Sequence, residues 1–222
     1  MENLEEIICY KFKNKELLKH ALTHPSANKK RREVDYERLE FVGDSVLSLV
    51  ISENLYHFYP REREGALAKR RAAIVCKQTL AEIAKDISLG EFLILGVGED
   101  QSGGRANLAN LENSLEALIA AIYFDGGLNE VRNFMERFFT KYINKIKTPP
   151  KDAKSTLQEW AQAQAMELPK YEILSITGPS HEPEIEVELT LDSKSKIVTA
   201  SSKKEAERLA ALELIKELGI DD

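Results

Sequence analysis

The stretch Glu37-Arg-Leu-Glu-Phe-Val-Gly-Asp-Ser-Val-Leu47 sets three acidic side chains into a run with helical apolar spacing. Glu37, Glu40 and Asp44 are three and four residues apart, so a helix presents all three on one face. Like charges at this spacing repel by roughly a few tenths of a kcal/mol per pair, and a cation between them would remove that cost. The alternative is a solvated acidic face, which is the usual setting of acids at this spacing.

A second stretch, Asn113-Ser-Leu-Glu116, carries two oxygen-bearing side chains three residues apart within an apolar segment at 111–123. The apolar spacing indicates a mostly buried helix, in which an unpaired carboxylate is costly. A metal shared with the first stretch would relieve both costs. Because the candidate ligands are hard oxygens without Cys or His, that metal would be Mg²⁺ or Mn²⁺. Residue spacing alone leaves open whether the two helices meet.

Outward from these two stretches, apolar residues recur at helical spacing through the first 147 residues, without strand-like alternation. This region is therefore predicted to be an all-α domain. Its expected helices lie near residues 3–9, 15–22, 35–58, 63–85, 88–94, 110–124 and 128–146.

The sequence KTPPKDA at residues 147–153 contains two prolines, which end a helix and favour extended backbone. We place a linker at 148–153, which separates a first domain at 1–147 from a second domain at 154–222.

The second domain changes its period. A helix over 155–166 with Ser155 as its cap is expected first, followed by strands at 171–177, 184–191 and 196–200 and a helix over 202–218. The middle strand alternates apolar residues with three glutamates, as a half-buried antiparallel strand does. The second domain is thus predicted to be a small α+β domain of order α-β-β-β-α.

Composition sets the broad class. With 43% hydrophobic and 31% charged residues in 222, the chain is typical of soluble globular proteins. No window approaches the ~18 apolar residues of a membrane span, and the first residues lack a signal-peptide core. Cys9 and Cys76 lie in helix-like patterns without metal-type spacing, so we expect reduced core thiols and a cytoplasmic protein.

Charge is unevenly distributed. Residues 1–150 hold 22 basic and 22 acidic side chains, whereas residues 151–222 hold 9 and 15, which accounts for the net charge of −6. A nucleic-acid surface would therefore have to be a local basic patch. One basic run, residues 29–32, is either a solvated loop or a phosphate contact. The Gly-rich residues 96–105 lack the GK[ST] of a phosphate loop, so we expect no nucleotide cofactor.

These motifs together resemble the ribonuclease III family. Residues 37–47 resemble its signature, and the resemblance extends over nearly the whole chain in the family's order. The other similar stretches are ALTHPS at 21–26, GVGEDQSGGR at 96–105, LENSLEALIAAIYFDGG at 111–127 and the C-terminal α-β-β-β-α module, which resembles a double-stranded RNA-binding domain.

The resemblance implies a divalent-metal-dependent endoribonuclease that hydrolyses double-stranded RNA to 5′-phosphate and 3′-hydroxyl ends. Its implied metal ligands are Glu40, Asp44, Asn113 and Glu116. Among these, Asp44 and Glu116 would be catalytic. Two further acids, Glu37 and Glu64, would take outer or substrate-side positions. The ion would be Mg²⁺, with Mn²⁺ able to substitute.

One residue departs from the family pattern, which more often has Asp at the position of Asn113. An amide oxygen can still bind Mg²⁺, but the site loses one formal negative charge. We therefore expect weaker metal binding and a shifted metal optimum. Identical Mg²⁺ titration midpoints for the natural protein and Asn113→Asp would contradict this expectation.

The resemblance also implies a homodimer. In the family, the position of Phe41 is an aromatic side chain that enters the partner subunit, and each subunit cuts one strand to leave short 3′ overhangs. The alternative is an intramolecular core phenylalanine.

The C-terminal module would contact RNA through three segments. The candidate contacts are Ser155, Gln158, Glu159 and Gln162 on its first helix, His181 in a strand-joining loop, and Lys203 and Lys204 at the start of its last helix. Helix-end amides and lysines suit phosphates, and the first helix would reach the minor groove. A solvated His181 and an exposed helix start are the alternatives. The glycines usual before Lys203 are replaced by Val198 and Ala200, which leaves the geometry of that turn open.

The sequence therefore predicts a double-stranded RNA endonuclease. By resemblance, it would process ribosomal RNA precursors and some messenger and transfer RNAs. Two other hypotheses remain: a non-catalytic binder of double-stranded RNA that kept the fold, and an unrelated helical metallohydrolase for small phosphorylated substrates. The C-terminal module argues against the latter, since a small substrate needs no duplex reader.

Overall fold

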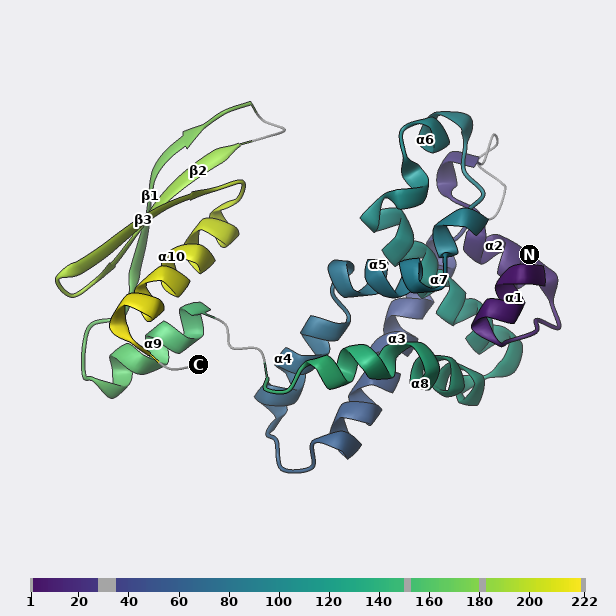
Figure 1. The fold of residues 1–222 in the computed structure, drawn as a ribbon, viewed down its shortest axis with the longest axis horizontal. Helices are drawn as coiled ribbons and strands as arrows, with labels where there is room; N and C mark the ends of the chain where they lie inside the picture. Colours follow the sequence, from purple (N-terminus) through teal and green to yellow (C-terminus); the bar gives the residue numbers. More distant parts are fainter. Residues whose placement is uncertain (1, 28–34, 150–152, 180–182, 221–222) are drawn as a thin grey trace. The chain divides into compact units, whose positions relative to one another are not determined.

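The computed structural model describes residues 2–27, 35–149, 153–179 and 183–220 (Figure 1). The chain divides into two compact units, Met1–Pro150 and Lys151–Asp222, and each is considered by itself.

The first unit is helical throughout its described residues, as expected, apart from one isolated bridge between Thr23 and Ile94. Its helices are α1 (Glu2–Ile8), α2 (Lys15–Leu22), η1 (Pro25–Ala27), α3 (Glu37–Phe58), α4 (Glu64–Ile74), α5 (Lys77–Asp86), η2 (Leu89–Phe92), α6 (Val97–Gln101), η3 (Gly104–Ala106), α7 (Leu108–Gly126) and α8 (Leu128–Lys145).

The centre of this unit is the pair α3 and α7, which pack along each other (Figure 1). Seven consecutive residues of α7, Glu116 to Ile122, are all buried, so this helix is enclosed on every side there. Gly43 on α3 permits the close approach. A Cβ atom at this position would lie 1.9 Å from the backbone oxygen of Glu116, which is too short for any side chain. The contact brings the acidic part of α3 directly against α7.

Two predicted helices in this unit were wrong. The single helix expected at 63–85 is broken between α4 and α5, where Cys76 has extended backbone angles and Thr79 donates its hydroxyl hydrogen to the Ala73 carbonyl at 2.9 Å. That bond satisfies a carbonyl at the end of α4, so the chain can turn without Gly or Pro. The helix expected at 88–94 is the short 3₁₀ turn η2, which follows Ser88 in a left-handed conformation.

The cysteine prediction was also wrong in part. Both Cys9 and Cys76 are free, but both are exposed and neither belongs to the core. Cys9 follows the last turn of α1 with φ 53°, and Cys76 lies at the α4–α5 break. Helical apolar spacing did not reveal that both positions fall at helix ends.

The second unit has the predicted order α-β-β-β-α. It comprises α9 (Ala153–Ala163), β1 (Lys170–Thr177), β2 (Glu184–Leu191), β3 (Lys194–Ala200) and α10 (Lys203–Leu218). The strands form one antiparallel sheet in the order β1-β2-β3. Helix α10 packs on β2 and β3 and against α9.

Strand β2 shows why the sequence pattern succeeded here. Val187, Leu189 and Leu191 are buried, whereas the three glutamates of the strand, Glu184, Glu186 and Glu188, remain at least partly accessible. Leu189 and Leu191 join residues of α9 and α10 in a separate small core. Helix α9 begins at Ala153. Ser155 therefore lies inside this helix, and the prediction that it caps the helix was wrong.

Candidate active site

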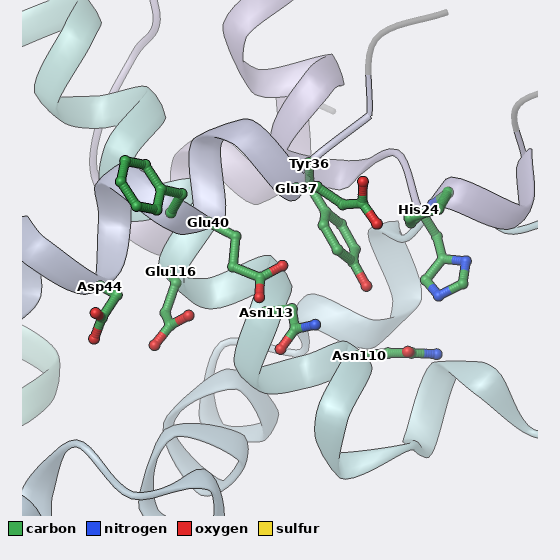
Figure 2. A pocket seen from close by; sticks show the side chains of 10 residues that line it. His24, Tyr36, Glu37, Glu40, Asp44, Asn110, Asn113 and Glu116 are labelled. Atoms are coloured by element: carbon green, nitrogen blue, oxygen red, sulfur yellow. The ribbon is translucent and has the colours of Figure 1, made fainter. Parts of the chain in front are cut away.

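A cavity of about 620 Å³ opens between α3, α7 and the segment that follows α2. Figure 2 shows side chains from these elements turned toward one another. The cavity is lined by residues of three groups: Glu37, Glu40, Phe41 and Asp44 from α3; Asn110, Asn113 and Glu116 from α7; and His24, Pro25 and Tyr36 from the chain between α2 and α3. The structure thus brings together five predicted acidic or amide site residues that lie in two distant stretches of sequence.

Glu116 is the most buried carboxylate of the cavity, with 9% of its surface exposed. Burial is the largest cause that raises the pKa of Glu116, and together with the negative charges of Asp44, Glu112 and Glu40 it brings this pKa to about 8. Within the described residues, no side chain or backbone group donates a hydrogen bond to it. A buried carboxylate without a donor is costly, and a cation beside it would relieve that cost.

Glu40 has the same tendency in a milder form. Burial raises the pKa of Glu40, and the neighbouring charges of Glu37 and Glu112 add to the effect. Glu112 lies one turn before Glu116 on α7 and is only partly balanced by Lys77, whose Nζ is 3.7 Å from its carboxylate. Negative potential therefore accumulates along this wall, which suits a divalent ion.

The donor set is oxygen only, so it fits Mg²⁺ or Mn²⁺. In the described part of the chain, no three His, Cys, Asp or Glu side chains converge closely enough to enclose an ion. A site of this kind is an open one, at which Mg²⁺ keeps several of its waters. Glu40, Asp44 and Glu116, with the amide oxygen of Asn113, are the residues that would hold it.

The sequence interpretation missed Tyr36 and Asn110, which form the other end of the cavity. Asn110 is 6% exposed, and its Nδ2 donates to Glu99 Oε1 at 2.7 Å and to the Gly104 carbonyl at 3.0 Å. Tyr36 is 2% exposed and precedes the first residue of α3. Neither position breaks the apolar pattern of its segment in a way that would identify it.

His24 lies against this end of the cavity. Its Nδ1 accepts a hydrogen bond from the Ser26 backbone N–H at 3.0 Å. Its ring packs edge to face against the Tyr36 ring, with 5.6 Å between the ring centroids. A ring nitrogen that accepts this bond leaves Nε2 as the donor of the neutral imidazole.

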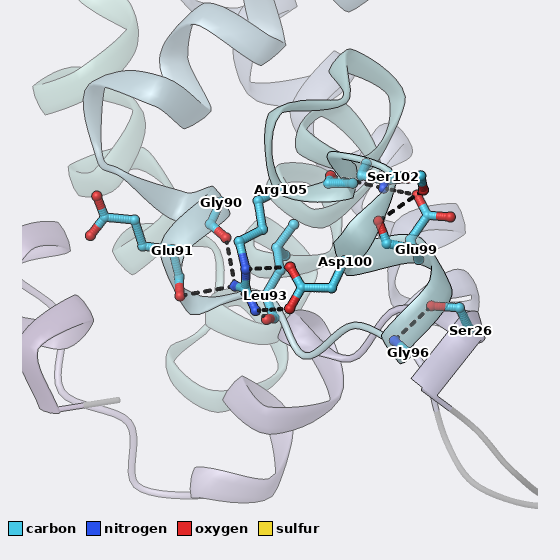
Figure 3. A network of polar contacts seen from close by, with 11 residues as sticks. Ser26, Gly90, Glu91, Leu93, Gly96, Glu99, Asp100, Ser102 and Arg105 are labelled. Carbon is cyan, nitrogen blue, oxygen red and sulfur yellow. Dashed lines mark hydrogen bonds and ion pairs between the residues drawn. The ribbon is translucent and has the colours of Figure 1, made fainter.

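A network of hydrogen bonds and an ion pair supports the end of the cavity formed by Tyr36 and Asn110 (Figure 3). Arg105 pairs with Asp100 through two nitrogens at 2.8 and 3.1 Å and donates to the carbonyls of Gly90, Glu91 and Leu93. The Gly96 backbone N–H donates to Ser26 Oγ at 2.9 Å. The network fixes the Gly-rich stretch, in which Glu99 accepts the hydrogen bond from Asn110 Nδ2.

Glu64 does not join the cavity. It is the first residue of α4 and lines a separate depression with Tyr56, His57, Glu62 and other residues of the α3–α4 turn. Within one copy of the chain, its predicted substrate-side position is therefore not part of this site.

Phe41 lies at the rim of the cavity with 78% of its surface exposed. The alternative of an intramolecular core phenylalanine is therefore wrong. Leu49, Tyr56 and Phe58 on the same helix are also largely exposed.

The predicted RNA-binding residues fall on the surface of the second unit. Gln158, Glu159 and Gln162 are exposed on α9, and Ser155 is half-buried. Lys203 and Lys204 are exposed in the first turn of α10, which Ser202 caps by accepting from the Glu205 backbone N–H at 3.3 Å.

Two predicted contacts need separate mention. The Nζ of Lys203 lies 3.8 Å from Glu207, so part of its charge is balanced within the helix. His181 and the basic run at 29–32 lie outside the described residues.

No described helix is long and apolar enough to cross a membrane.

Comparison with known proteins gives consistent matches over both units. A family model described as ribonuclease-III-like matches residues 14–143, and a double-stranded RNA binding motif matches residues 153–218. Ribonuclease 3 of Wolbachia pipientis wMel is 49% identical over 222 residues, covering 98% of this chain and 96% of the relative. Ribonuclease 3 of Ehrlichia ruminantium (strain Welgevonden) is 48% identical over 210 residues, covering 94% and 92%.

The first unit also resembles a solved structure. The nuclease domain of ribonuclease III from Campylobacter jejuni, described as flexible in a region involved in dimer formation, is 41% identical with a TM-score of 0.60. The match covers 63% of this chain and 96% of that one.

Proposed function

The chain belongs to the ribonuclease III family, and from that premise we propose that the acidic cavity hydrolyses double-stranded RNA with a bound divalent ion. The endoribonuclease activity on double-stranded RNA follows from the family and its RNA-binding motif. The metal requirement, the end chemistry and the natural targets are the proposed part. The observation that carries the proposal is Glu116, a buried carboxylate that no described residue neutralises.

The residues of the cavity have distinct parts in the reaction. A divalent ion would supply a water of lowered pKa and positive charge opposite the scissile phosphate. Glu116 would be the key ligand of that ion, and Asp44 on the opposite helix would hold or polarise the water. Glu40 would add negative charge, and Asn113 would contribute an amide oxygen. The water oxygen would bond to phosphorus and give up a proton as the bond from phosphorus to the 3′ oxygen breaks. The departing 3′ oxygen would take up a proton, which leaves a 5′-phosphate and a 3′-hydroxyl.

The second unit would supply duplex recognition. The exposed amides of Gln158 and Gln162 can reach the 2′-hydroxyls of a shallow minor groove, which distinguish RNA from DNA. Lys203, Lys204 and the free amides at the start of α10 suit a phosphate. The unit can therefore bind RNA locally although its net charge is negative.

The protein is proposed to act as a homodimer joined around Phe41. The exposure of this ring supports the proposal, because a large exposed apolar group can mark an interaction surface. Phe41→Ala should shift sedimentation toward the monomer, with a dimer Kd raised roughly 10-fold or more. An unchanged sedimentation profile would place the interface elsewhere.

A dimer with one site per strand would leave short 3′ overhangs. Its proposed targets are ribosomal RNA precursors and some messenger and transfer RNAs, in the cytoplasm.

The test is cleavage of a perfect RNA duplex of a few dozen base pairs, with Mg²⁺ and with chelator, with both strands mapped. Glu116→Gln should lower the cleavage rate by ~10³-fold or more, since the ion and its water lose their buried anchor. Glu136→Gln, at an exposed acid on α8, is the matched control and should cut normally.

The outcome also decides between nuclease and binder. Staggered Mg²⁺-dependent cuts with 5′-phosphates support the proposal. Tight duplex binding without cleavage, even with Mn²⁺ and Asn113→Asp, would make the chain a non-catalytic binder.

A further inference from the structure

The end of the cavity at His24, Tyr36 and Asn110 has no part in the proposed ion site. A Mg²⁺ ion with six waters occupies roughly 200 Å³. The cavity of about 620 Å³ therefore has room for more than the ion and its waters. Figure 2 shows His24 and Asn110 at the same end of the cavity, away from Asp44 and Glu116.

The tautomer of His24 is fixed by its contacts with Ser26. The Ser26 backbone N–H donates to His24 Nδ1 at 3.0 Å. Because a backbone N–H always carries its hydrogen, Nδ1 carries none, and the ring hydrogen is on Nε2. The Ser26 hydroxyl also lies 2.7 Å from Nδ1, and its oxygen accepts from the Gly96 backbone N–H at 2.9 Å. His24 therefore offers Nε2 as a donor, and no described residue accepts from it.

The His24 ring is held from several sides. Its backbone N–H donates to the Ile94 carbonyl at 2.9 Å, and the ring packs edge to face against Tyr36. Gly96 allows the two chain segments to meet, because a Cβ atom there would lie 2.2 Å from the Ser26 carbonyl oxygen. The donor at Nε2 thus has a fixed place in the cavity wall before any substrate binds.

Asn110 offers the opposite kind of group. Both hydrogens of its Nδ2 are used, one by Glu99 Oε1 at 2.7 Å and one by the Gly104 carbonyl at 3.0 Å. Its Oδ1 can only accept, and no described residue donates to it. The side chain is 6% exposed and lines the cavity, so this acceptor is left for a group that enters.

A donor and an acceptor at one end of a cavity suit a hydroxyl group. A phosphate oxygen only accepts, so it would find no partner in Asn110 Oδ1. A metal ion would find no ligand at His24 Nε2, which carries the ring hydrogen. The 2′-hydroxyl of RNA both donates and accepts, and it is present on every nucleotide whatever the base.

We propose that this end of the cavity binds a ribose 2′-hydroxyl of the strand to be cut, with His24 Nε2 as donor and Asn110 Oδ1 as acceptor. The contact makes the first unit itself selective for RNA over DNA, independently of the second unit. The inference rests on the proposed function, because it assumes that double-stranded RNA lies across the cavity.

The test measures the coupling between His24 and single 2′-hydroxyls. With Mg²⁺, kcat/KM is compared for the natural chain and His24→Asn on an all-ribose duplex and on duplexes with one 2′-deoxyribose at successive positions around the cut. Asparagine keeps an oxygen near the place of Nδ1 for the Ser26 N–H but has no group in place of Nε2. On the all-ribose duplex, His24→Asn should lower kcat/KM about fivefold, the effect of one hydrogen bond.

His20 provides the matched control. It is half-buried on α2 and does not line the cavity, so His20→Asn should leave kcat/KM unchanged.

The deoxyribose scan separates a direct contact from a structural effect. At one position near the cut, 2′-deoxyribose should slow the natural protein about fivefold but His24→Asn hardly at all, because the variant has already lost the contact. Equal slowing of both proteins at every position would overturn the inference. If the natural protein cuts no duplex, the proposed function fails, and the inference fails with it.

Nitrogen-15 NMR of the natural protein covers the case in which His24→Asn does not fold. The chain has four histidines, which keeps their ring signals few. In the free protein His24 should carry its hydrogen on Nε2. With chelator to prevent cleavage, the Nε2 signal should shift when the all-ribose duplex binds, and less when the duplex has 2′-deoxyribose at the position that slows cleavage. A hydrogen on Nδ1, or equal shifts with both duplexes, would refute the inference.

Discussion

Arg70 and Glu116 are both buried charged side chains of the first unit, with 2% and 9% of their surfaces exposed. Arg70 is fully partnered. It pairs with Glu62 at 2.6 and 2.8 Å, donates to the carbonyls of Ile146 and Lys147, and lies 3.7 Å over the Tyr59 ring. Glu116 receives no hydrogen bond from any described residue and faces other carboxylates.

Burial disfavours the charged form of both side chains, but only Arg70 has partners that offset this cost. The hydrogen bonds of Glu62 raise the pKa of Arg70 and so favour its charged form, whereas burial raises the pKa of Glu116 and so disfavours its charged form. Arg70 is balanced by the protein and joins the α3–α4 turn to the end of α8. Glu116 has no balancing partner among the described residues, so a cation or a proton would balance it. A buried charge thus indicates a ligand only when its partners are missing.

The largest expected effect is the pH dependence caused by Glu116 in metal-free protein. Its pKa is about 8 when folded against 4.5 for the unfolded reference. Between these values the folded state holds a proton that the unfolded state has lost, so the free energy of unfolding falls as pH rises. Above pH ~8, Glu116→Gln should be more stable than the natural protein by up to ~4 kcal/mol, a difference that vanishes near pH ~4.

The measurement is urea unfolding in chelator from pH 5 to pH 9. The same carboxylates remain in both proteins except for Glu116, so the difference between the two profiles isolates that residue. Parallel profiles would mean that Glu116 is neutralised within the protein and that the contrast with Arg70 is false.

The next effect concerns Arg70. Arg70→Met removes one partner of a buried pair and leaves two backbone carbonyls without their donor, so the free energy of unfolding should fall by ~3 kcal/mol. For a chain of this length, that corresponds to a Tm lower by roughly 6–12 °C. Thermal unfolding monitored by circular dichroism measures it.

The neighbouring Arg71 provides the control. It is exposed and donates to Ser52 Oγ at 3.0 Å. Arg71→Met should change the Tm little, since an exposed side chain keeps its water. Equal Tm values for the two variants would show that the partners of Arg70 contribute no more than a surface contact.

The smallest effect is stabilisation by the ion itself. At ten times its Kd, Mg²⁺ should raise the free energy of unfolding of the natural protein by about 1.4 kcal/mol. Arg70→Met should gain the same increment, and Glu116→Gln should gain almost none. A gain that survives Glu116→Gln would place the ion away from this carboxylate.

The sequence predicted the parts of the site that follow from local spacing. Glu40 and Asp44 share a face of α3 because they are one turn apart, and the same holds for Asn113 and Glu116 on α7. That α3 and α7 meet depends on Gly43, whose lack of a Cβ atom allows the contact. The sequence does contain this glycine, but its partner 73 positions away is set by tertiary packing.

Other features could not be predicted because their partners lie far along the chain. Arg70 is one of several arginines in and just before α4. Its bonds to Glu62 and to the carbonyls of Ile146 and Lys147, which follow α8, distinguish it from Arg71. Tertiary packing also places Tyr36 in the lining of the cavity and Glu64 in a separate depression. In the second unit, strict alternation in β2 predicted the buried face, since strand neighbours impose a period of two.

The close contact at Gly43 sets the distance between the two helices that would hold the proposed ion. The backbone of α3 lies so close to Glu116 that any Cβ at position 43 would push the helices apart by about 1 Å, because contacts under about 3 Å are not tolerated. Mg²⁺ and Ca²⁺ differ in ligand distance by only ~0.3–0.5 Å. The spacing between Asp44 and Glu116 is therefore set by the main chain, and an ion bound there as proposed would meet ligands whose separation an exchange of side chains would not reproduce.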